Sequence, residues 1–206
     1  MLYEIDHARL SELIVPGRSL ILLLNPDDQH FSRTFGKMEF NNAMKVLLDL
    51  HSSHGVPIIT VACEYLNNTE SLRDQVMKQK RDLRTSRSSS QSGQYENLLK
   101  EYREVMRQLS DATAAVSNRE NVFADNNVTD KVNFDITDRV IVAGFDTDAE
   151  VLMSASGAIS RGILPIIVSD GVSSPSERLH FGALEIMSGF AEIVDSREIQ
   201  ALFEGV

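Results

Sequence analysis

Six carboxylate side chains follow apolar runs that the sequence pattern predicts to be buried strands: Asp27, Asp28, Asp146, Asp148, Glu150 and Asp170. Carboxylates at strand ends can transfer protons or bind a hard cation. Asp148 and Glu150 have a simpler explanation, because acidic side chains are stabilised near the N-terminus of a helix. We therefore expect no metal site and no cofactor, and we keep Asp27 as a candidate for acid–base chemistry.

The chain has one cysteine, Cys63, whose thiol is the other group able to do chemistry. It follows the apolar residues 57–62, so it lies at the end of a predicted strand. Cys63 is a candidate nucleophile, but a cysteine in such a position usually packs as a small apolar side chain. A single cysteine also excludes an internal disulfide and fits a reducing compartment.

Hydrophobic periodicity predicts the elements that position these groups, most clearly in a βαβ unit. Residues 140–143 form a continuous apolar run, as expected of a strand buried on both faces, and Gly144 ends it. Thr147 and Glu150 then have the spacing of a capping box that begins a helix. Residues 163–168 are a second buried run. The turn after the first strand of such a unit is where open α/β sheets bind ligands.

The same stretch resembles a known family. Residues 144–151 (G-F-D-T-D-A-E-V), the small-residue helix after them, residues 168–174 (V-S-D-G-V-S-S) and His180 are similar to the isochorismatase-like cysteine hydrolases. The family has G-V-x-T-D-x-C-V, then a helix, a strand that ends in D-A, and a histidine about ten residues further on. The resemblance implies a three-layer α/β/α sandwich with a mostly parallel six-stranded sheet, strand order 3-2-1-4-5-6.

The resemblance also implies where the catalytic groups would be. Glu150 occupies the position of the nucleophilic cysteine, Asn25 that of the aspartate after the first strand, and Asn118 that of the lysine. The family's mechanism needs a thiolate, a proton acceptor and a cation, so these replacements predict that it is lost. Some residues are expected to line the pocket at which the family's hydrolases bind substrate, called here the family pocket: Asn25, Phe31, Asn118, Phe123, Asp146, Thr147 and Glu150.

Metal-dependent nicotinamidase relatives carry an aspartate and two histidines after the second strand. Here no histidine lies between His54 and His180. The comparison therefore implies that a zinc or iron site of that type is absent.

Residues 69–111 depart most from the family pattern. Residues 70–84 and 95–109 are charged and helical in pattern, and a serine-rich linker, residues 86–93, separates them. We expect an inserted helical hairpin within a single domain spanning residues 1–206. Its second helix has an apolar stripe that should pack on the sheet or on a neighbouring helix: Leu98, Leu99, Tyr102, Val105, Met106 and Leu109.

Composition excludes several classes of protein. The chain has 206 residues, 42% of them hydrophobic, and a formal charge of −10. No apolar run approaches the roughly 20 residues that a membrane span needs, so we expect no membrane segment and a cytoplasmic location. The negative charge disfavours nucleic-acid binding.

These observations predict a divergent family member that lacks cysteine-hydrolase activity. It would bind a small molecule or a partner chain through the family pocket. It would also form a homo-oligomer, as relatives do. One alternative is an active hydrolase that uses Glu150 or Asp27 as the acid or base on a vinyl ether or another non-amide substrate. A second alternative is an interaction scaffold that acts through the insert at residues 69–111.

Overall fold

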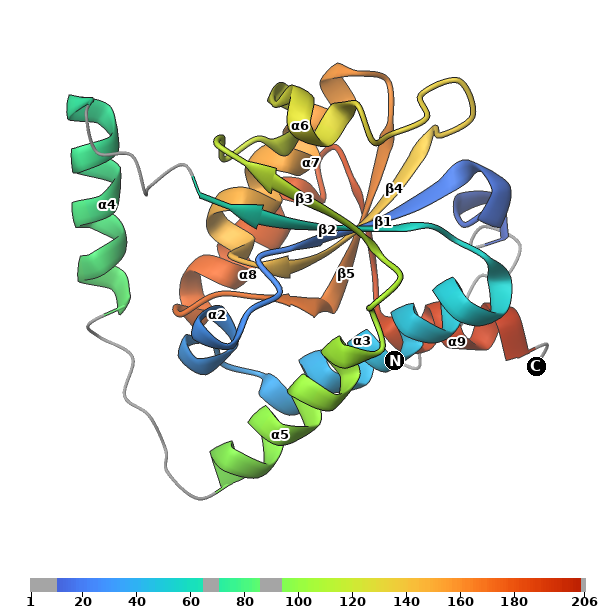
Figure 1. Ribbon diagram of the computed structural model, residues 1–206, viewed down its shortest axis with the longest axis horizontal. Coiled ribbons are helices and arrows are strands. Elements are labelled where there is room, and N and C mark those ends of the chain that lie inside the picture. The colour runs from blue at the N-terminus through green and yellow to red at the C-terminus, as the bar shows by residue number, and fades with distance from the viewer. Residues whose placement is uncertain (1–10, 65–70, 86–93, 205–206) are drawn as a thin grey trace.

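The chain folds around one sheet of six parallel strands in the order β3-β2-β1-β4-β5-β6, as predicted (Figure 1). The computed structural model describes residues 11–64, 71–85 and 94–204. Its strands are β1 Ser19–Leu24, β2 Ile58–Cys63, β3 Thr113–Ser117, β4 Arg139–Phe145, β5 Leu164–Ser173 and β6 Glu192–Val194. Because all strands are parallel, their carboxyl ends share one edge of the sheet.

Helices cover both faces of the sheet and make three layers (Figure 1). The labelled helices are α2 Asp28–Arg33, α3 Lys37–His54, α4 Leu72–Thr85, α5 Gln94–Arg107, α6 Asn126–Thr129, α7 Leu152–Ser160, α8 Glu177–Met187 and α9 Ser196–Glu204. Helices α3, α5 and α9 belong to one face, and α6, α7 and α8 to the other.

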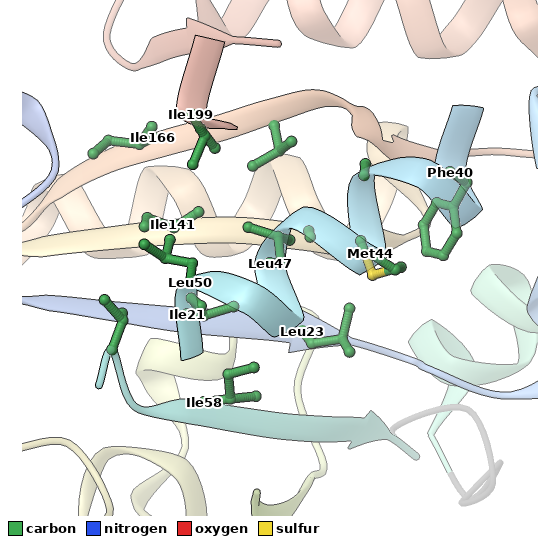
Figure 2. Close-up of a cluster of buried hydrophobic side chains, with 14 of the residues drawn as sticks. Ile21, Leu23, Phe40, Met44, Leu47, Leu50, Ile58, Ile141, Ile166 and Ile199 are labelled. Carbon is green, nitrogen blue, oxygen red and sulfur yellow. The ribbon is translucent and has the colours of Figure 1, made fainter. Parts of the chain in front are cut away.

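The two faces of the sheet bury separate hydrophobic clusters. In β1, Ile21 and Leu23 point to the cluster under α3, while Leu20, Leu22 and Leu24 point to the opposite one. This alternation is the period-two geometry of a strand, and burial on both faces explains the continuous apolar run. Figure 2 shows the first cluster, in which side chains of α3 and α9 lie against β1, β2, β4 and β5.

Two strands extend beyond their predicted ends. β4 runs through Gly144 to Phe145, and β5 continues through Asp170 to Ser173. The register shifts where β5 has extra residues: Val142 pairs with Ile167, but Gly144 pairs with Val172. Pairing with β4 therefore resumes after a bulge, which the polar sequence Ser-Asp-Gly does not reveal.

The predicted insert has two helices that do not pair with each other. α5 packs against α3 and α2, with Tyr102 and Val105 buried in the core cluster, which confirms the predicted apolar stripe. α4 lies apart from α5 in Figure 1. The linker at residues 86–93 lies outside the described residues. No described helix is long and apolar enough to cross a membrane.

Gly144 provides a test of how closely β1 and β4 approach beside the carboxyl edge. It has a φ of 110°, and a Cβ atom there would lie 2.1 Å from the backbone oxygen of Leu24. Gly144→Ala should lower the free energy of unfolding by about 3 kcal/mol or more, because both the backbone conformation and the contact forbid a side chain. Urea denaturation measures the change.

Gly17→Ala is the matched control, because a Cβ at Gly17 would meet no atom within 4 Å. It should leave the unfolding midpoint nearly unchanged. Equal effects of the two substitutions would contradict this description of the β1–β4 contact.

Candidate functional site

The Asn25 side chain connects three strands at the carboxyl edge of the sheet. It directly follows β1 and is 2% exposed. Its Nδ2 donates to the backbone oxygen of Phe145, at the end of β4, over 3.0 Å. Its Oδ1 accepts from the backbone N–H of Cys63, at the end of β2, over 2.7 Å. Asn25 has a φ of 50°, a left-handed conformation that asparagine tolerates better than most residues.

Glu150 binds the peptide group between Phe145 and Asp146, the same peptide whose carbonyl Asn25 binds. Its side chain is fully buried, and Oε2 accepts from the backbone N–H of Asp146 over 3.2 Å. Asn25 thus binds the C=O and Glu150 the N–H of the cis peptide between Phe145 and Asp146. The structure therefore brings two of the three predicted triad positions to one peptide group.

The predicted capping box at Thr147 is wrong in detail. Glu150 reaches back to the N–H of Asp146 rather than to that of Thr147. The first turn, Thr147–Val151, is π-helical, and α7 begins only at Leu152. A π-helical turn has one more residue per hydrogen-bonded ring than an α-helix, and such turns are frequent at functional sites.

Thr147 instead contacts a histidine on α8. Its Oγ1 lies 2.9 Å from Nδ1 of His180, and both residues are buried. Burial lowers the pKa of the His180 imidazole to about 4, against a smaller opposing effect of the Asp148 charge. Asp148 in turn accepts a hydrogen bond from Ser174 Oγ over 2.7 Å. His180 is therefore neutral near pH 7.

Asn118, the third triad position, lies at the same edge but is exposed. It follows Ser117, which pairs with Cys63 in the β2–β3 register. Its backbone N–H donates to the carboxylate of Asp125 over 2.7 Å. Burial alone would raise the pKa of Asp125, but hydrogen bonds from Asn118, Asn127 and Ser117 hold it below its ordinary value. No hydrogen bond of the Asn118 side chain to Asn25 or Glu150 is present among the described residues.

Asp27 forms a pair with His30 that sequence reasoning missed. Its Oδ1 caps α2 by accepting from the His30 N–H, and its Oδ2 lies 2.7 Å from His30 Nδ1. Burial alone would raise the pKa of Asp27, but the hydrogen bonds and charge of His30 outweigh it and lower that pKa. The spacing of the pair, an acidic N-cap with histidine three residues later, was a usable signal.

Two of the predicted pocket residues lie in the hydrophobic core instead. Phe31 is 0% exposed and stacks on Tyr102 at 4.2 Å between ring centroids, while Phe123 is 2% exposed in the cluster on the opposite face of the sheet. They do not meet, and neither has surface open to a ligand in this structure. Among the described residues, no group of three or more His, Cys, Asp or Glu side chains is arranged to hold a metal ion.

The family model of the isochorismatase domain matches residues 22–198. The chain belongs to the isochorismatase family. That span runs from within β1 to the first residues of α9 and contains all of the site described above. No curated protein matches this chain.

Solved structures agree with the isochorismatase fold. YcaC from Pseudomonas aeruginosa, with hexane-2,5-diol and covalent acrylamide, has a TM-score of 0.69 at 14% identity over 95% of this chain and 84% of that one. A cysteine hydrolase from Pseudomonas syringae has 0.66 at 14% over 93% and 96%. YcaC from Escherichia coli, described as an octameric hydrolase of unknown specificity, has 0.62 at 16% over 94% and 82%.

Asn25 should be essential to the stability of this isochorismatase-family domain. Asn25→Ala leaves a buried carbonyl at Phe145 and a backbone N–H at Cys63 without their partner, so we expect a loss of about 2–4 kcal/mol in the free energy of unfolding. Asn118→Ala removes an exposed carboxamide and should change it by less than about 0.5 kcal/mol. Guanidinium denaturation of both variants measures the contrast. Similar losses would contradict the bridging role of Asn25.

His180 should make stability depend on pH. Its folded-state pKa, about 4, is below the ordinary value of 6.5, so the unfolded chain binds the proton more readily. The His180 contribution is complete above pH 6.5 and is lost as the pH falls toward 4, by about 1–2 kcal/mol after solvent screening. Urea denaturation from pH 7 to pH 4 measures it. His180→Gln should flatten this part of the profile, and an unchanged slope would contradict the prediction.

Proposed function

We propose that this chain is an isochorismatase-family protein without cysteine-hydrolase activity, which binds a small molecule or a partner chain at the carboxyl edge of its sheet. The observation that carries the proposal is the buried carboxylate of Glu150, hydrogen-bonded to the backbone N–H of Asp146. A carboxylate at a helix start keeps the negative charge that the position favours, but it is a far poorer nucleophile than a thiolate.

The other two positions support the same conclusion. A general base needs a basic group that can take up a proton, and the Asn25 carboxamide is not basic; its Nδ2 and Oδ1 instead hydrogen-bond the backbone. Asn118 carries no charge, so it cannot hold an anionic pair together. We further propose that the Asp27–His30 pair faces the ligand. Phe31 and Phe123 are less suited to this role because both are buried in the core.

A hollow beside β1 is compatible with a small ligand. It has a volume of about 310 Å³ and lies between the turn after β1 and α5, lined by Pro26, Asp28, Tyr102, Arg103, Met106 and Arg107. Arg103 pairs with Asp28 at 2.6 Å across it. A larger hollow of about 540 Å³ between α3 and α9 shares no residue with the Asn25 and Glu150 site. We favour the first because it adjoins the strand end that carries Asn25.

We also propose that the chain self-associates. The support is the Escherichia coli relative, whose structure is described as an octamer. As a single domain spanning residues 1–206, the protein would present the helices outside its sheet to other copies.

A second candidate function is acid–base hydrolysis of a non-amide substrate such as a vinyl ether. The Asp27–His30 pair favours it, because a carboxylate that holds Nδ1 of a histidine orients Nε2 to exchange a proton with a bound molecule. Such chemistry needs no thiol. Glu150 is less suited to this role because it is buried and already hydrogen-bonded.

Assays of hydrolysis separate the two candidates. The wild-type protein should not accelerate hydrolysis of an amide, a nitrile or a vinyl ether above the uncatalysed rate, because no competent nucleophile or base stands at the triad positions. Glu150→Cys supplies the missing thiol. With acrylamide as the probe, peptide mass mapping should find an adduct at residue 150 only in that variant, with any reaction at Cys63 equal in both proteins.

Turnover by the wild-type protein that is lost in Glu150→Gln would contradict the proposal. Turnover of the vinyl ether that survives Glu150→Gln but is lost in His30→Asn would establish the second candidate instead. His54→Asn serves as the control, since His54 lies at the end of α3, against Phe203.

A further inference from the structure

Helix α8 has two different sides. His180, Ala183 and Met187 face the sheet and are buried. On other parts of its surface, Phe181 is 56% exposed and Ile186 is 61% exposed. Two large apolar side chains so exposed on one helix leave apolar surface that the rest of the described chain does not cover.

Gly182 adds a second observation on the same surface. It lies in the interior of α8, where glycine weakens a helix relative to alanine. A Cβ atom at Gly182 would meet nothing within 4 Å, so no contact within the described structure requires the glycine. Its absence of a side chain does, however, allow a ring or a second helix to approach the α8 backbone.

Two charged residues flank Phe181 and Gly182, each three residues away in the sequence. Arg178 and Glu185 are exposed, seven residues apart, and therefore lie two turns apart along one face, about 10 Å in rise. Neither side chain forms an ion pair or hydrogen bond within the described residues. The midpoint of the helix segment between Arg178 and Glu185 lies between Phe181 and Gly182.

This arrangement is complementary to itself. A two-fold axis through the midpoint, perpendicular to α8, would place Arg178 against Glu185 of a second copy and Phe181 against Gly182 of that copy. Isologous dimers require this pattern, in which residue i contacts residue j and j contacts i. One axis therefore accounts for both contacts: it pairs the opposite charges, and it places the exposed Phe181 ring at the glycine that leaves room for it.

We propose that α8 is a self-association surface at which a second copy of this chain pairs antiparallel with the first. The occupant is the chain itself, because Arg178 and Glu185 complement each other under two-fold symmetry. This inference deepens the self-association given under the proposed function by naming its surface, but the observations on which it stands belong to α8 alone.

The surface adjoins the candidate site. The Phe181 ring lies 4.9 Å from the His180 ring, edge to face, and His180 contacts Thr147. A second copy that covers Phe181 would therefore also cover the outer wall of the Thr147–His180 pair.

Sedimentation velocity of the full chain across the micromolar range tests the surface. The wild-type chain should associate. Arg178→Glu and Glu185→Arg should each weaken association about tenfold or more, because each places two pairs of like charges across the axis. The double variant Arg178→Glu with Glu185→Arg restores opposite charges and should recover association to within a few-fold of the wild type.

Lys131→Glu, an equal charge reversal at an exposed residue outside α8, is the control and should leave association unchanged. Association that is insensitive to both single reversals, or that fails to recover in the double variant, would overturn the α8 surface while self-association stands. A chain that stays monomeric throughout would overturn both. Neither result alters the outcome of the hydrolysis assays, so the proposals fail separately.

Discussion

The carboxyl edge of the sheet depends on the Asn25 carboxamide. Three parallel strands, β1, β2 and β4, end at this edge, where backbone groups beyond the ladder need other partners. One buried side chain satisfies a carbonyl of β4 and an N–H of β2 at once. A carboxylate at this position could accept from Cys63 but would have no hydrogen to give to the Phe145 carbonyl. An amide at the position of the family's aspartate therefore has a structural consequence as well as a chemical one.

Sequence reasoning predicted the sheet because burial on both faces leaves a strong signal. Runs such as residues 140–143 are typical of strands buried on both faces, and the strand order then followed from the family resemblance and from the rules for parallel connections. The extension of β5 through Asp170 was not predictable, since it depends on Phe145 and Val172 finding partners after a bulge. The polar residues after Val168 suggested a loop, but pairing with β4 makes them part of the strand.

The family resemblance predicted where Asn25 and Glu150 lie in the fold, but not what they contact. The family resemblance placed Asn25 directly after the first strand and Glu150 in the turn after β4, and the structure brings both to the peptide between Phe145 and Asp146. Which atom each side chain would contact was not predictable. The Thr147 hydroxyl, for example, could cap its own helix or bind His180, 33 residues away, and sequence carries only the first possibility. Phe31 and Phe123 belong to the two core clusters, and a family motif alone does not distinguish a pocket wall from a core side chain.

Cys63 has a practical value that does not depend on catalysis. It is the one thiol of the chain, and its backbone N–H is anchored to the same asparagine that joins β1 to β4. A spin label or fluorophore attached there needs no competing cysteines to be removed, and it would be positioned at the junction of three strands. Spectroscopy of a single labelled species can thus follow how this edge responds to ligands, to acidity or to contact between copies.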